Sequence, residues 1–210
     1  MNSTEVSLQY RLKTILFFSL LFVVFYGFTN RYPIFEPRLL PLTPIDEFFG
    51  FRPWTVWIYI SDYLLMFLPP FFIQKRGVIK RLVQAVLLNF FLHFPVFLLF
   101  PTTMVRPPLI EQNLTNTVFH FMRQMDTPVN CFPSQHVSLC FVMAMTFLSY
   151  KKKIGILFLI WAVLISLSTM TTKQHYIWDV AGGVTVALII YLAVFRGREQ
   201  QALILIDPKK

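Results

Sequence analysis

Residues 131–150 read CFPSQHVSLCFVMAMTFLSY, a short polar stretch at the mouth of a long apolar run. A bilayer crossing takes roughly 20 mostly apolar residues, with a range of about 17–25. The run from Pro133 to Tyr150 is long enough, and Ser134, Gln135 and His136 stand at its start. The sequence therefore predicts a membrane-spanning helix that holds a polar cluster at one membrane face.

The composition of the whole chain agrees with this prediction. Of the 210 residues, 56% are hydrophobic and 14% are charged, whereas an ordinary soluble domain is about one quarter charged. Lipid is therefore the solvent that we expect for most of the surface. The length allows one domain, so we treat residues 1–210 as a single integral-membrane domain.

Five further apolar stretches reach a similar length, and a segment in lipid satisfies its backbone hydrogen bonds internally as a helix. We therefore predict an all-α fold, a polytopic bundle of six transmembrane helices. The predicted spans are Leu12–Phe28, Trp54–Ile73, Leu82–Phe100, Pro133–Tyr150, Ile154–Met170 and His175–Phe195.

The distribution of charge orients the bundle. An even number of spans places both termini on one side, and almost all of the net charge of +9 falls on that side, for example at Lys151–Lys153. Basic residues favour the cytoplasmic side, so we expect cytoplasmic N- and C-termini. The basic excess also meets anionic lipid headgroups, so it requires no nucleic acid partner.

The two longest connections, about Thr29–Pro53 and Pro101–Phe132, fall on the opposite, outer side. Both are rich in proline and aromatic residues, which are common where a chain lies along a membrane interface. A long connection can form the rim or lid of a substrate site, and it can also be a plain surface loop. The sequence leaves both interpretations open.

Polar side chains gather where the predicted helices reach that outer side. Each signal is weak alone, but ionisable groups at membrane depth are costly and tend to mark function. We therefore expect one site at the periplasmic, extracellular or lumenal face. Its candidate residues are Arg106 after the third span, Ser134, Gln135 and His136 at the fourth, Ser168 and Lys173 at the fifth, and His175 and Asp179 at the sixth.

The start of the fourth span has features of a phosphate-binding site. Pro133 suits the first turn of a helix, and the backbone N–H groups of the next three residues would then lack helical acceptors. Such a helix start favours an anion, and the Ser134 hydroxyl adds a donor. The planar guanidinium of Arg106 matches phosphate oxygens.

His175 and Asp179 lie one helical turn apart, so the carboxylate can hold one ring nitrogen and leave the other free as a nucleophile. His136 can give a proton to a leaving oxygen and then activate water. These residues predict phosphoryl transfer in two steps through a phosphohistidine.

A metal site is the competing interpretation, since two histidines and one aspartate could bind a metal ion. However, the helical His-Glu-x-x-His zinc spacing is absent, and acidic residues near the site are few for magnesium. We therefore expect catalysis without a metal or another cofactor.

These residues resemble the motifs of the type 2 phosphatidic acid phosphatase superfamily, six-helix membrane enzymes related in fold to vanadium haloperoxidases. The resemblance implies His175 as the nucleophile, Asp179 as its partner and His136 as the general acid, with Ser134 and Arg106 on the phosphate. The matching residues are Arg106 and Pro107 in the first family motif, Pro133, Ser134 and His136 in the second, and Ser168, His175 and Asp179 in the third.

Three positions depart from the family pattern. Leu99 stands at a lysine position, Gln135 replaces a glycine and Thr169 replaces an arginine, so two phosphate-binding cations are missing. Lys173, close to His175, is a candidate replacement for one of them. The strings NCFPSQH and TKQHYIWDV are most similar to the inositol phosphorylceramide synthase-like branch, in which some members move a phospho-headgroup between lipids.

The favoured function is therefore that of a lipid phosphate phosphatase or phosphotransferase. A headgroup transferase between lipids, like inositol phosphorylceramide or sphingomyelin synthase, is the alternative, because a phosphodiester carries less charge than a monoester and needs fewer cations. A non-catalytic lipid-binding protein stays open because two cations are missing. The lipid itself and the oligomeric state are left open.

Three features lie outside the family pattern. Asp62 falls within the second predicted span, where a hydrogen bond to a neighbouring helix is the plainer interpretation. His93 stands beside Pro95 and is expected to be a packed polar residue at a kink. Gly182 and Gly183 favour close helix packing.

Overall fold

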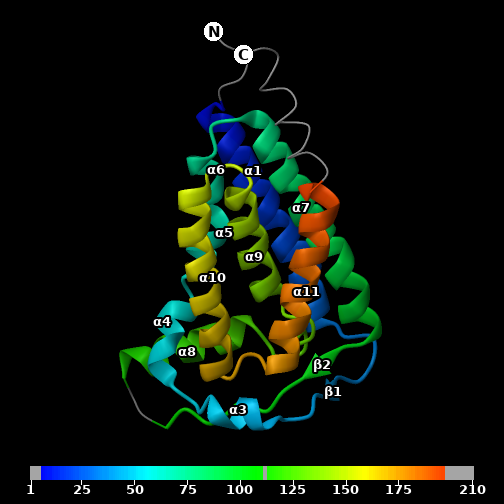
Figure 1. Cartoon of the computed structure of the whole chain (residues 1–210). Helices are drawn as coiled ribbons and strands as arrows, with labels where there is room; N and C mark the ends of the chain where they lie inside the picture. Colours follow the sequence, from blue (N-terminus) through cyan, green and yellow to red (C-terminus); the bar gives the residue numbers. More distant parts are fainter. Residues whose placement is uncertain (1–5, 111–112, 197–210) are drawn as a thin grey trace, which may run out of the picture.

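The computed structural model describes residues 6–110 and 113–196. Over these residues the protein is a bundle of long helices, with short elements gathered at one end (Figure 1). The predicted all-α class is confirmed as a mostly helical fold with one very short strand pair. The long elements are α1 (Leu8–Leu21), which continues through the π-helical turn η1 (Phe22–Tyr26) into α2 (Gly27–Arg31), and α7 (Arg76–Leu99), α9 (Gln135–Leu148), α10 (Lys152–Thr171) and α11 (Ile177–Val194).

Four helices in the described part of the chain are long and apolar enough to cross a membrane. They cover the first, third, fifth and sixth predicted spans, with ends that differ by a few residues. The remaining two predicted spans are a shorter helix and a series of short helical pieces, so a total of six crossings stays a prediction. The four helices are Leu8–Arg31, Arg76–Leu99, Lys152–Thr171 and Ile177–Val194.

The predicted span Pro133–Tyr150 is the 14-residue helix α9. At 1.5 Å per residue α9 is about 21 Å long, which is shorter than the roughly 30 Å of a hydrocarbon core. Most of its side chains are buried, since α7, α10 and α11 all pack against it. The apolar character of this segment therefore reflects its place at the centre of the bundle.

The predicted span Trp54–Ile73 is a series of short helical pieces instead of one helix. Proline has no N–H to donate and its ring crowds the preceding turn, so Pro69 and Pro70 begin a new piece. An earlier break, at Ser61, is held to α10 because the indole N–H of Trp161 donates to the Ser61 hydroxyl at 2.8 Å. The pieces are η2 (Pro53–Thr55), α4 (Val56–Tyr59), α5 (Asp62–Phe67) and α6 (Pro69–Phe72).

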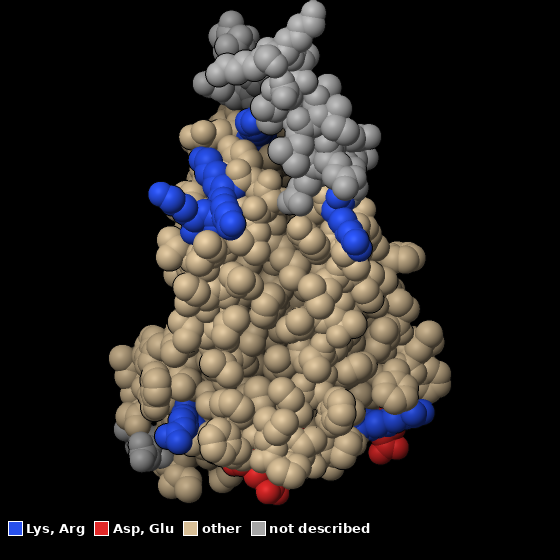
Figure 2. All heavy atoms as spheres, in the orientation of Figure 1, with Lys and Arg blue, Asp and Glu red and all other residues tan. Residues whose placement is uncertain are grey.

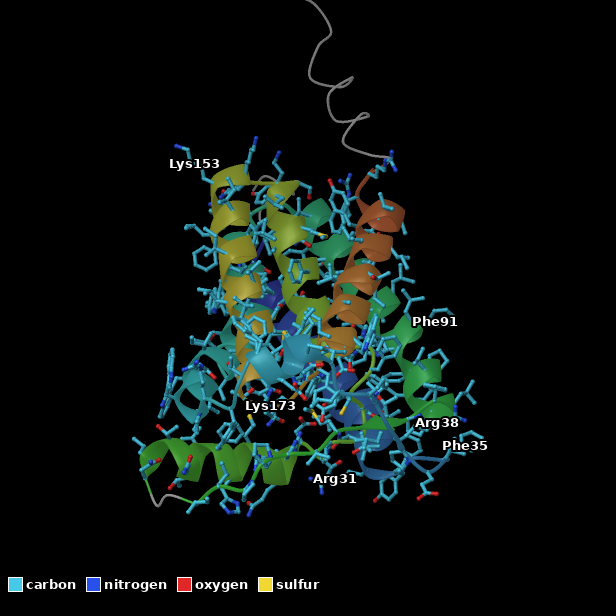
Figure 3. The ribbon with its side chains drawn as sticks, turned by 60° about the horizontal axis from the view of Figure 1, so that its bottom comes forward. Arg31, Phe35, Arg38, Phe91, Lys153 and Lys173 are labelled. Atoms are coloured by element: carbon cyan, nitrogen blue, oxygen red, sulfur yellow. The ribbon has the colours of Figure 1, made fainter. Side chains whose placement is uncertain are left out.

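The two ends of the bundle differ in charge. Lys and Arg gather at the end where α1 begins and α11 ends, while the opposite end carries both signs (Figure 2). Figure 3 shows Lys153 at the basic end and Lys173 and Arg31 at the other. Both described ends of the chain thus lie at the basic end, but the side of a membrane that this end faces stays a prediction.

The two long connections form an ordered layer across the end opposite the basic one. β1 (Arg38–Leu39) pairs in parallel with β2 (Thr102–Thr103), which ties the first connection to the second. α8 (Leu114–Met125) lies across this end of the bundle, and α3 (Pro44–Phe48) lies there as well (Figures 1 and 3). These elements cover the ends of α9 and α11 that carry the predicted site.

α11 crosses the start of α9 at very short range. A Cβ on Gly183 would lie 2.5 Å from the carbonyl oxygen of Ser134, and one on Gly182 would lie 2.7 Å from the ring of Phe132. Only glycine allows this approach, so the prediction of close helix packing at this pair is confirmed.

Candidate functional site

The two histidines of the predicted mechanism meet at the covered end of the bundle. His136 is in the first turn of α9 and His175 directly precedes α11. Their ring centroids are 5.9 Å apart, and both side chains are almost completely buried. The structure therefore brings together two imidazoles that stand far apart in the sequence.

The predicted sixth span begins as a helix only at Ile177, so His175 lies two residues before α11, while its carboxylate partner Asp179 is in the first turn of that helix. Nδ1 of His175 lies 3.4 Å from Oδ2 of Asp179, and the same oxygen accepts the backbone N–H of Tyr176 at 2.8 Å. The backbone N–H of His175 donates to the carbonyl of Thr169 at 3.1 Å, which holds the connecting turn. That turn requires a left-handed residue, Lys173, with φ 53°. Nδ1 is thus engaged and Nε2 is left for chemistry.

The start of α9 differs from the prediction in one respect. Pro133 lies before the helix, and Ser134 is the N-cap, whose hydroxyl accepts the N–H of Val137 at 3.3 Å. The N–H of Ser134 is also used, since it donates to the carbonyl of Asp179 at 3.0 Å. The N–H groups that remain for an anion in this turn are those of Gln135 and His136. The bond to Asp179 fixes the two histidine segments relative to each other.

The side chain of Gln135 points away from this anion position. Its Nε2 donates to Oδ1 of Asn89 on α7 at 3.2 Å, and Asn89 in turn donates to the hydroxyl of Ser138 at 2.5 Å. Nearby, Nδ1 of His93 lies 2.8 Å from the carbonyl of Asn89, as expected for a packed polar residue. Gln135 therefore braces α9 against α7, and only its backbone N–H faces the site.

Arg106 is connected to the rest of the site through the carboxylate of Asp126. Its guanidinium donates to the carbonyl of Asp126 at 2.6 Å and to Oδ2 of the same residue at 3.3 Å. The other carboxylate oxygen of Asp126 accepts the hydroxyl of Tyr26 at 2.5 Å and the amide of Asn30 at 3.1 Å. The Tyr26 ring lies 5.7 Å from that of His136. In this state Arg106 is neutralised by Asp126, a residue that the sequence analysis did not select.

Ser168 and Lys173 are engaged elsewhere. The buried hydroxyl of Ser168 donates to the carbonyl of Ile165 within α10 at 2.6 Å. The Lys173 ammonium donates to the carbonyls of Asp46 and Phe49 at 2.5 and 2.6 Å, against α3, and burial lowers its pKa. In this arrangement Lys173 holds the surface layer in place, and it does not fill either missing cation position. A phosphate contact by either residue stays a prediction.

His136 has two polar neighbours that come from the broken second segment. Its Nε2 lies 3.3 Å from the hydroxyl of Tyr59 and 3.8 Å from Oδ2 of Asp62. Both residues are buried, and Oδ1 of Asp62 has no hydrogen-bond partner among the described residues. The sequence does mark Asp62 as unusual, since a carboxylate within an apolar segment is costly. The break between α4 and α5 that brings it to His136 could not be foreseen.

An apolar cavity of about 620 Å³ extends from this cluster. Its polar end includes His136, Asp126 and Tyr26. Val23 and Phe121 are 67% and 65% exposed, so the apolar wall continues to the outer surface of the bundle. The apolar lining comes from the first long helix, from α8 and from the broken segment, and includes Phe22, Val23, Ile60, Val118, Phe121, Met122 and Met125.

The described residues contain no group of three His, Cys, Asp or Glu side chains arranged to hold a metal ion. The site therefore consists of two imidazoles with separate carboxylates, the first turn of α9 and an arginine paired with an aspartate. Such a set can accept an anion, supply a nucleophilic nitrogen and move a proton.

A comparison with known protein families matches residues 49–193 to the PAP2 superfamily. Comparisons with curated proteins and with solved structures gave no significant match. The family match supports a function of the phosphatase or phosphotransferase type. Placement in the inositol phosphorylceramide synthase-like branch stays a prediction. Since the match covers more than half of the chain and contains every site residue that the sequence predicts, the chain belongs to the PAP2 superfamily.

Proposed function

We propose that the protein is a membrane enzyme that transfers the phosphoryl group of a lipid phosphate ester through a phosphohistidine on His175. The observation that carries this proposal is the meeting of His136 and His175 at 5.9 Å, with Asp179 on Nδ1 of His175. Membership of the PAP2 superfamily supports the reaction class. The reaction requires no metal ion, because imidazole supplies both the nucleophile and the proton.

The reaction has two balanced steps. In the first, Nε2 of His175 attacks phosphorus, the bond from phosphorus to the leaving oxygen breaks, and that oxygen takes a proton from His136. In the second, an acceptor hydroxyl gives its proton to His136 and attacks phosphorus, and the bond to His175 breaks. The N–H groups of the first turn of α9 and the guanidinium of Arg106 stabilise the charge on the transferring group.

The cavity supports a lipid as the substrate. It begins at His136 and Asp126, and its apolar walls reach exposed residues on the flank of the bundle. A phosphate at the two histidines therefore leaves an apolar tail in a pocket of matching character. We place this end of the bundle at the periplasmic, extracellular or lumenal face of the membrane.

The charge balance favours a second candidate, the transfer of a phospho-headgroup between lipids. Leu99 is 65% exposed and Thr169 donates to Ser166 within its own helix, so neither family cation position carries a positive charge. Arg106 is paired with Asp126, and the ammonium of Lys173 lies on α3. A phosphodiester with one negative charge fits this balance better than a dianionic monoester, and a lipid hydroxyl then replaces water in the second step.

The test is a substrate panel with the purified protein in detergent, in which inorganic phosphate and lipid products are both measured. Phosphatidic acid represents the monoesters, and a phosphodiester lipid with a ceramide acceptor represents headgroup transfer. His175→Ala should remove all activity, while His120→Ala, a change at an exposed histidine of α8, should remove none. Vanadate should inhibit the wild type.

Each outcome separates the candidates. Phosphate release supports hydrolysis, and headgroup exchange without release supports the transferase. Activity that survives in His175→Ala, or strong inhibition by EDTA, would contradict the phosphohistidine mechanism. A folded protein that binds lipids but turns none of them over would leave only the non-catalytic alternative.

A further inference from the structure

We propose that Asp62 is the positioning residue of His136: from ion-pair distance of Nε2, its carboxylate stabilises the protonated imidazole that gives its proton to the leaving oxygen. This inference rests on the proposed function. It concerns a residue outside all three family motifs, on a segment that the sequence predicts only as an apolar span.

Among the described residues, His136 is the one basic side chain within ion-pair distance of Asp62. Oδ2 of Asp62 lies 3.8 Å from Nε2 of His136, and Oδ1 has no partner in the described part of the chain. The Asp62 residue is 6% exposed, and its Oδ1 is buried. A buried carboxylate with an unpartnered oxygen is costly, and a protonated base beside it lowers that cost. The imidazole of His136 is the base within reach.

The other charged groups around His136 are already balanced. Arg106 forms an ion pair with Asp126 at 3.3 Å, and His175 faces Asp179. The hydroxyl of Tyr59, 3.3 Å from the same Nε2, is neutral and adds a hydrogen bond. A single proton makes the pair of Asp62 and His136 neutral, so Asp62 adds no further negative charge to the cluster. The pair can therefore store the proton that the first reaction step consumes.

The two histidines then use their carboxylates for different tasks. Asp179 holds Nδ1 of His175 so that the opposite nitrogen can attack phosphorus. Asp62 stabilises the protonated imidazole of His136 until the ester bond breaks, when the proton passes to the leaving oxygen. In the second step the proton of the acceptor hydroxyl returns to the pair. Asp62 does not touch the substrate, and no atom or electron pair beyond this proton is exchanged.

Two substrates with different leaving groups distinguish a role of Asp62 in proton transfer from a merely structural role. A choline alkoxide needs a proton to leave, whereas p-nitrophenolate leaves without one. The two probes are hexadecylphosphocholine and hexadecyl p-nitrophenyl phosphate, which share a tail and a phosphodiester group with one negative charge. We expect Asp62→Asn to lower kcat for the first probe roughly 10- to 100-fold, a part of the usual contribution of a general acid, and to leave the second nearly unchanged.

Two control variants complete the kinetic test. Asp62→Glu keeps the carboxylate and should restore part of the activity on hexadecylphosphocholine. Ser61→Ala removes the hydroxyl that holds α5 to Trp161, and it should leave the ratio of the two probes at the wild-type value. Equal losses on both probes in Asp62→Asn would show that the residue only supports the fold, and would overturn the inference.

A measurement without turnover keeps the inference separate from the proposed function. Histidine labelled with ¹⁵N gives signals from the four imidazoles of the chain, and those of His136 are identified by their loss in His136→Gln. Asp62→Asn should shift the Nε2 signal of His136 and leave those of His93, His120 and His175 in place. An unchanged His136 signal would overturn the inference even if the wild type turned over every probe. A protein inactive on all probes would contradict the proposed function, while the NMR result would still decide the pairing.

Discussion

His175 and His136 each have a carboxylate neighbour, but the two pairs are built differently. His175 stands four residues before Asp179, just ahead of α11, and the two side chains meet at 3.4 Å because Asp179 caps the start of that helix by accepting the N–H of Tyr176. His136 is on α9 and Asp62 is on α5, and they meet at 3.8 Å only because the second segment breaks after α4. The comparison shows that one half of the proposed mechanism is local and the other half depends on the packing of the whole bundle.

The local pair gives the largest expected effect. Asp179→Asn should lower kcat roughly 10⁴-fold, because the amide no longer holds Nδ1 of His175 in the right tautomer. The loss should be similar for alkyl and p-nitrophenyl leaving groups, since both require the nucleophile. Steady-state rates with the two hexadecyl probes measure it. A loss confined to the alkyl probe would reverse the roles given to the two histidines.

The pair of His136 and Asp62, which meets only through tertiary packing, should show the opposite pattern, in which the loss of activity depends on the leaving group. His136→Ala should lower kcat for the alkyl probe by about 10²–10⁴-fold and for the p-nitrophenyl probe far less. Because Asp62 acts through His136, the double variant with Asp62→Asn should be no slower than His136→Ala alone. Additive losses in this double-mutant cycle would give Asp62 an independent role.

The contact that joins the two pairs can be disturbed at Gly183. A methyl group there meets the carbonyl of Ser134, so Gly183→Ala should separate α11 from α9 and destabilise the protein by about 1–3 kcal/mol. Thermal unfolding in detergent measures this change. Gly50→Ala is the matched control, because its Cβ has open space around it. Equal melting temperatures for the two variants would contradict the close packing.

The smallest effect is expected in the cavity beside the pair of His136 and Asp62. Gly27 lines the cavity and has nothing within 4 Å of a Cβ, so Gly27→Leu starts a side chain from an open position on the cavity wall. KM should rise for a hexadecyl probe and not for its butyl counterpart, by roughly threefold to tenfold for a few lost methylene contacts. Gly77→Leu, an equally open position that does not line the cavity, should leave both KM values unchanged. Equal changes for both tail lengths would argue against a tail in this cavity.

The predicted helices were confirmed where an apolar run is long and continuous, as in α7, α10 and α11. The prediction for Trp54–Ile73 was less accurate because hydropathy does not register the breaks at Ser61 and Pro69. Lys173 shows the same limit, since its spacing from His175 made it a candidate phosphate ligand, whereas its side chain lies on carbonyls of the α3 region. Spacing along the chain defines neighbours within a helix, but it does not give the direction in which a loop side chain points.

The sequence by itself determined that most of the protein surface is suited to lipid and that the fold is helical. It also determined the superfamily motifs and the pairing of His175 with Asp179. Each follows from composition or from spacing along the chain. The tertiary structure alone decided that the N–H of Ser134 bonds to α11, that Arg106 is paired with Asp126, and that Asp62 faces His136. The reason is physical: these contacts join residues from separate elements, and packing of the whole bundle sets the distances between them.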